Sequence, residues 1–124
     1  MEFEYGPLIL KSQDRLRMTD LLTDVFEFEV DTENHCLALG PWRVRLIDSQ
    51  ASDVFEQCVV FEFYVFSQDD LNEISSKFHF FLYRKSDSIE VKEKMTIVEN
   101  DSYKILSVID LDKREWQFKF KLKD

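Results

Sequence analysis

The chain has 124 residues and a formal net charge of −9, and 44% of its residues are hydrophobic, so it fits one folded domain and is not a disordered chain. Its apolar runs are too short to cross a bilayer, and its acidic start is unlike a secretory signal. We therefore expect a cytoplasmic protein that binds neither nucleic acid nor membrane, because an acidic surface repels phosphates and anionic lipid.

A short amphipathic helix is predicted near the start, over Ser12–Thr23, with Ser12 as its cap and Asp14 in its first turn. A strand through Leu16–Met18 is the alternative. The next segment, Asp24–Val30, alternates apolar and polar residues and predicts a half-buried strand. We expect a turn after it and a returning strand over His35–Leu39. The apolar residues that recur at helical spacing are Met18, Leu21, Leu22 and Val25.

The most apolar stretch of the chain, Gln57–Ser67, predicts the central strand of the sheet, because both of its alternating faces carry apolar residues. A strand over Trp42–Ile47 precedes it. Ser67 is followed three positions later by an acidic residue, a pattern typical of a cap on one or two helical turns. The aromatic segment Phe78–Arg84 predicts a second strand, next to Gln57–Ser67 in the middle of the sheet.

The last third of the chain predicts a strand over Ile89–Glu99 and a hairpin formed by Tyr103–Leu111 and Glu115–Lys123. One face of the last strand carries a row of lysines, which is typical of a solvent-facing edge strand. The prediction is a mainly β, single domain over residues 1–124. It is an antiparallel sheet of about seven or eight strands, curled into a barrel or sandwich, with one or two short helices. We see no internal repeat.

Residue types used in catalysis do not converge in this sequence. His35 and the neighbouring Cys36 supply at most two metal ligands, whereas a structural zinc site needs four. Both cysteines, Cys36 and Cys58, are expected to be reduced and buried. Glu62 and Glu93 interrupt apolar rows, so each could line a ligand cavity. We favour a structural interpretation, in which each faces water at a strand position or forms a salt bridge with a residue such as Arg43 or Lys94. We therefore expect no enzyme, no metal and no cofactor.

Negative charge is concentrated in the first part of the chain, since residues 1–70 carry 15 acidic and 5 basic side chains. Such a surface attracts basic proteins and raises their association rate. The predicted function is a non-enzymatic inhibitor or immunity-type protein that captures a basic protein partner. The alternatives are a β-barrel carrier of a small apolar ligand and a viral or phage accessory or structural subunit. The predicted partner-binding residues are Asp20, Asp24, Glu27, Glu29, Asp31 and Glu33.

Overall fold

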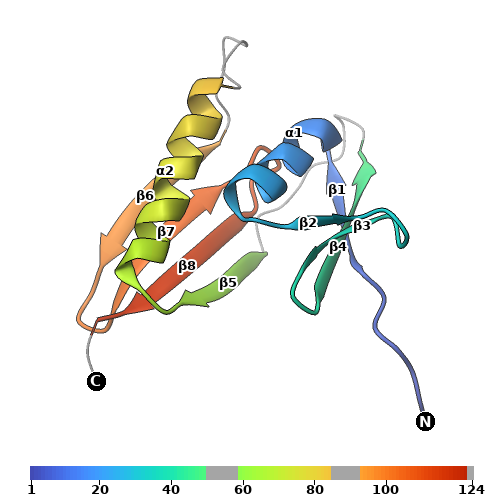
Figure 1. Cartoon of the computed structure of the whole chain (residues 1–124), viewed down its shortest axis with the longest axis horizontal. Coiled ribbons are helices and arrows are strands. Elements are labelled where there is room, and N and C mark those ends of the chain that lie inside the picture. The colour runs from blue at the N-terminus through green and yellow to red at the C-terminus, as the bar shows by residue number, and fades with distance from the viewer. Residues whose placement is uncertain (50–58, 85–92, 123–124) are drawn as a thin grey trace. The chain divides into compact units, whose positions relative to one another are not determined.

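A computed structural model describes residues 1–49, 59–84 and 93–122, which belong to two compact units, Met1–Asp53 and Val54–Asp124 (Figure 1). Each unit has one four-stranded sheet and one helical segment. The order along the chain is the same in both: strand, helix, then three strands. The prediction of a single domain over residues 1–124 stays a prediction.

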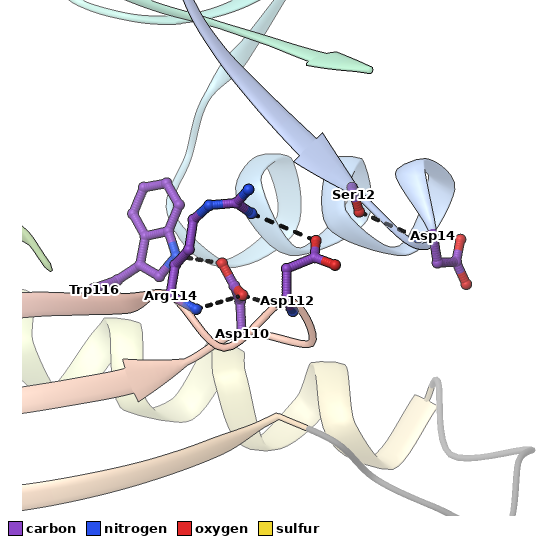
Figure 2. A network of polar contacts seen from close by, with 6 residues as sticks. All are labelled: Ser12, Asp14, Asp110, Asp112, Arg114 and Trp116. Atoms are coloured by element: carbon purple, nitrogen blue, oxygen red, sulfur yellow. Dashed lines mark hydrogen bonds and ion pairs between the residues drawn. The ribbon is translucent and has the colours of Figure 1, made fainter. Parts of the chain in front are cut away.

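The first unit has a sheet of order β1-β4-β3-β2, in which β1 and β4 are parallel and the other pairs antiparallel. Its helix was predicted correctly, but Asp14 caps it by accepting a hydrogen bond from the backbone N of Arg17 at 3.1 Å. Ser12 instead accepts a hydrogen bond from the Asp14 backbone N (Figure 2). The elements are β1 (Leu8–Ser12), α1 (Arg15–Asp20), the π-helical η1 (Leu21–Val25), β2 (Glu29–Asp31), β3 (Cys36–Leu39) and β4 (Trp42–Asp48).

The second unit has a sheet of order β5-β8-β7-β6, in which β5 and β8 are parallel and the other pairs antiparallel. The predicted hairpin is confirmed as β7 and β8, although β8 lies inside the sheet, between β5 and β7, and is no edge strand. The elements are β5 (Val60–Val65), α2 (Gln68–Arg84), β6 (Lys94–Glu99), β7 (Tyr103–Ile109) and β8 (Glu115–Lys121).

The prediction of a mainly β chain with about eight strands is confirmed for the described residues, but that of a single antiparallel sheet is wrong. The strands form two mixed sheets that do not close into one barrel. A parallel pair of strands needs a long crossover connection, and in each unit the crossover includes the helix. The two units are therefore repeats in topology, which the sequence did not reveal.

Three predicted strands are misplaced. The strand expected over Asp24–Val30 is wrong, because its first residues belong to η1 and only β2 is a strand there. Gln57–Ser67 contains β5, which lies at the edge of its sheet and not in the centre. Phe78–Arg84 is the last part of α2. Ser67 does cap this helix, since its Oγ accepts a hydrogen bond from the Asp70 backbone N at 3.1 Å, but the helix runs for 17 residues.

The core of the second unit lies between α2 and one face of its sheet. Trp116 on β8 is fully buried, and its ring lies 4.3 Å from that of Phe61 on β5, measured between centroids. Because side chains alternate along a strand, the neighbours of these residues point to the opposite face. Buried side chains of this core are Leu71, Phe78, Phe81, Leu106, Val108, Trp116 and Phe118.

Among the described residues, no helix has the length and hydrophobicity required of a membrane-spanning segment. Cys36 is a buried free thiol, as predicted, whereas Cys58 lies outside the described residues.

Candidate functional site

The face of the second sheet that points away from α2, here called the open face, carries a polar cluster. Strand register places Tyr64 on β5 opposite Lys119 on β8, and Tyr103 on β7 opposite Lys121. All of these side chains are exposed or half-buried. Because charged and polar side chains occupy the inner strands of this face, it is not packed as a core. Polar groups next to aromatic rings on one surface are typical of sites that bind a ligand. The open-face residues used below are Glu62, Tyr64, Lys94, Tyr103, Ser107, Glu115, Gln117, Lys119 and Lys121.

Glu62 connects two of these strands. Its Oε2 lies 2.9 Å from Nζ of Lys119, and its Oε1 accepts a hydrogen bond from the Tyr64 hydroxyl. Lys119 also lies over the ring of Tyr103, with Nζ 5.8 Å from the centroid. The Tyr64 and Tyr103 rings are 6.1 Å apart between centroids and are tilted. The structural interpretation of Glu62 is therefore confirmed: the residue is exposed on a strand and forms a salt bridge, with Lys119 and not with Arg43 or Lys94.

These contacts hold each group of the cluster in a defined protonation state. The hydrogen bond from Tyr64 and the ion pair with Lys119 lower the pKa of Glu62. The same carboxylate raises the pKa of Tyr64 and that of Lys119. At neutral pH the cluster therefore presents a carboxylate, an ammonium group and a neutral phenol. Such a set binds polar groups well, and Tyr64, which donates its proton to Glu62, has oxygen lone pairs left to accept a hydrogen bond.

Replacing Glu62 with glutamine should lower the pKa of Tyr64, because the charged acceptor that holds the tyrosine proton is lost. The fold should be retained, because Glu62 is an exposed residue. Carbon-13 NMR of ring-labelled tyrosine across an alkaline titration measures this pKa. An unchanged titration of Tyr64 in the Glu62→Gln variant would show that the hydrogen bond is not formed in solution.

A second group of polar side chains lies next to this cluster on the open face. Glu115 Oε2 accepts a hydrogen bond from Oγ of Ser107 at 3.3 Å and another from Nε2 of Gln117. Gln117 is also the register partner of Glu62 on β5. The open face therefore carries linked polar groups across β5, β8 and β7.

Another polar network, in the turn between β7 and β8, is buried and has a structural role (Figure 2). One oxygen of Asp110 accepts hydrogen bonds from the backbone N atoms of Asp112 (2.8 Å) and Arg114 (3.0 Å). The other oxygen accepts a hydrogen bond from Nε1 of Trp116 at 2.8 Å. Burial raises the pKa of Asp110 to about 6, although the bonds from Trp116 and Arg114 act in the opposite direction. This network fixes the turn in which Lys113 adopts a positive φ of 67°.

The six residues predicted to bind a partner lie along α1, η1, β2 and the turn that follows it. Glu29 and Asp31 share one face of β2, since they are two residues apart on one strand. Asp31 is not simply a surface charge: hydrogen bonds from Asn34 lower its pKa and close the turn. Their role in binding a basic protein partner stays a prediction. The others are at the end of α1 (Asp20), in η1 (Asp24), before β2 (Glu27) and in the turn (Glu33).

In the part of the chain that the structure describes, no three His, Cys, Asp or Glu side chains are grouped so that they could hold a metal ion. His35 is exposed in a turn and His79 is exposed on α2. Glu93 is buried, with 2% of its surface exposed. The sequence did contain one signal for the open face, because Gln117, Lys119 and Lys121 alternate with buried residues.

Known structures share the two-sheet architecture described above. The fosfomycin resistance protein FosX from Mesorhizobium loti is 12% identical, with a TM-score of 0.70 over 98% of this chain and 95% of that one. A glyoxalase/bleomycin resistance protein/dioxygenase family enzyme from Burkholderia phytofirmans is 11% identical, with a TM-score of 0.70 over 93% of this chain and 96% of that one. FosX from Listeria monocytogenes is 11% identical, with a TM-score of 0.68 over 100% of this chain and 95% of that one.

The chain has the fold of the glyoxalase/bleomycin resistance proteins. Identity of 11–12% establishes the fold alone. No protein-family model and no curated protein sequence matches the chain.

This fold corrects the predicted function. The prediction of a non-enzymatic inhibitor or immunity-type protein is wrong, because the structures that share the fold are described as resistance proteins and as an enzyme. The alternative of a β-barrel carrier fails as well, since the two sheets do not form a closed barrel. The alternative of a viral or phage subunit receives no support from these neighbours.

Proposed function

We propose that this chain is a resistance-type protein that binds a small, negatively charged organic molecule on the open face of its second sheet. The observation that carries the proposal is the linked group of Glu62, Tyr64, Lys119 and Tyr103 on a sheet face not used for the core. The resistance names of proteins with the same fold support it.

Charge on the open face supports an anionic ligand. The chain as a whole has a net charge of −9, yet this face carries three lysines and two glutamates. Lys119 and Lys121 are two residues apart on β8 and therefore point to the same side. A phosphonate or carboxylate near both ammonium groups gains charge-assisted hydrogen bonds. The rings of Tyr64 and Tyr103 supply an apolar surface for the rest of the molecule.

Fosfomycin, a small phosphonate, is the first probe for this site, and isothermal titration calorimetry measures its binding. Replacing Lys119 with methionine should weaken binding at least ten-fold, because the ammonium group nearest the tyrosines is lost. Lys104→Met is the matched control, since Lys104 lies on β7 but on the opposite face of the same sheet. Phosphorus NMR of the same mixture distinguishes binding from conversion, because an altered molecule gives a new signal.

The proposal fails if fosfomycin and a panel of other small phosphonates and carboxylates do not bind. It also fails if Lys119→Met and Lys104→Met weaken binding equally. Location in the cytoplasm and the absence of nucleic-acid and membrane partners stay predictions.

A further inference from the structure

A cavity of about 500 Å³ lies in the first unit, between α1 and the sheet. Its walls and floor are mostly apolar, and they include the fully buried Val44 and the nearly buried Leu37. Leu16 and Val30 also line it, and they are 81% and 61% exposed. The cavity is therefore open to solvent on one side. Its size is in the usual range for sites that bind small molecules.

The cavity has a physical cause in the length of the helix. In the second unit the 17-residue α2 packs against its sheet, whereas α1 in the first unit has six residues before it becomes η1. A helix rises about 1.5 Å per residue, so α1 is too short to cover its sheet along the full length of the strands. Apolar side chains such as Val30 and Leu46 are left lining a cavity.

The elements around the cavity carry a net negative charge. Residues 14–48, which form α1, η1, β2, β3, β4 and the turns between them, carry eight Asp or Glu and four Arg. Arg15, which lines the cavity, is paired with Asp48 at 2.9 Å, so part of its charge is compensated. Asp31, also in the lining, has a lowered pKa and is ionised at neutral pH. The electrostatic field of these elements favours a cation near the cavity.

We propose that this cavity binds a small organic cation with an apolar body, such as an aromatic or aliphatic amine. The apolar part lies against Leu37, Val44 and Leu46, and the ammonium group stays at the open side, in the field of the acidic elements. This site belongs to the first unit and is independent of the proposed anion site on the open face. In this proposal the acidic side chains of residues 14–36 attract the cation to the cavity.

Calorimetric titration with 1-naphthylmethylammonium and with 1-naphthylacetate tests the proposal, since the two probes share a ring system and differ in charge. At low salt the cation should bind at least ten-fold more tightly than the anion, and the difference should shrink in 0.5 M salt. Val30→Trp should weaken binding of the cation at least ten-fold, because the larger ring occupies the cavity. Ile9→Trp is the matched control, since Ile9 is exposed on β1 but does not line the cavity.

A charge variant tests whether the acidic elements around the cavity strengthen binding of the cation. Glu29→Gln combined with Glu33→Gln should weaken binding of the cation about three-fold at low salt and leave that of the anion unweakened. Glu2→Gln with Glu4→Gln is the control for the same change in net charge. Equal affinities for the two probes, or binding unaffected by Val30→Trp while thermal melting shows a folded variant, would overturn the proposal. Loss of cation binding in Lys119→Met would also overturn it.

Discussion

Replacing Trp116 with alanine should lower the free energy of unfolding by about 4 kcal/mol, the largest effect expected of a single substitution among the residues that the structure describes. Trp116 is fully buried on an inner strand, and it contacts the rings of Phe61 and Phe63. The substitution creates a cavity and also removes the donor that bonds to Asp110. Urea denaturation followed by circular dichroism measures the change.

Trp42→Ala is the matched control for this prediction, because Trp42 is half-buried on β4 and makes a looser ring contact with Phe28, at 5.5 Å between centroids. Trp42→Ala should lower the free energy of unfolding by at most half as much as Trp116→Ala does. If Trp116→Ala does not fold, Trp116→Phe is measured instead. That variant keeps a six-membered aromatic ring but loses the pyrrole ring of the indole with its N–H, and we expect a loss of about 2 kcal/mol from the unpaired Asp110 oxygen. Equal effects at the two tryptophans would contradict the assignment of Trp116 to the core.

The second large effect concerns pH. The pKa of Asp110 in the folded protein is about 6, above its ordinary value of 3.8, because the carboxyl group is buried. The folded state therefore holds this proton more tightly than the unfolded state does. The contribution of this bound proton to the stability of the folded state is fully present below about pH 4 and is lost as the pH rises through 6. A shift of this size corresponds to about 3 kcal/mol. Stability should thus decrease from pH 4 to pH 7 by about this amount through Asp110.

Other carboxylates titrate in the same range, so the measurement is a comparison of variants. Asp110→Asn cannot titrate, and its urea stability between pH 4 and pH 7 should lack the decrease found in the wild type. The variant should be less stable at pH 4, because the amide cannot accept all three hydrogen bonds that Asp110 accepts. Parallel pH profiles for the wild type and Asp110→Asn would refute the prediction.

The aromatic segment Phe78–Arg84 was predicted as a strand but is the last part of α2, and its composition explains this error. Phe and Tyr are common in strands, and Phe78–Arg84 contains four of them, so propensity favoured a strand. The buried residues of the helix are Leu71, Phe78 and Phe81, and together with the half-buried Ile74 they are spaced by three or four positions. That spacing is helical, and it is visible only when the segment is joined to the residues before it.

The open face shows a different kind of error. The alternation in β8 correctly separated Trp116 and Phe118 from Lys119 and Lys121. The neighbour of β8 could not be found in the same way, because β5 reaches it by a parallel crossover through α2, and nothing in the local pattern records that pairing. Glu62 and Lys119 are 57 positions apart in the sequence, and only the register of β5 on β8 brings them to 2.9 Å.

The sequence by itself determined the number of strands, the two faces of β8, the position of the first helix, and the acidic character of residues 14–36. These properties depend on near neighbours, because side-chain alternation, helical spacing and capping act over a few residues. Only the tertiary structure decided that there are two mixed sheets, that β5 is an edge strand, and that Glu62, Tyr64, Tyr103 and Lys119 meet on one face. Those properties depend on contacts between distant segments, whose pairing is selected by packing of the whole unit.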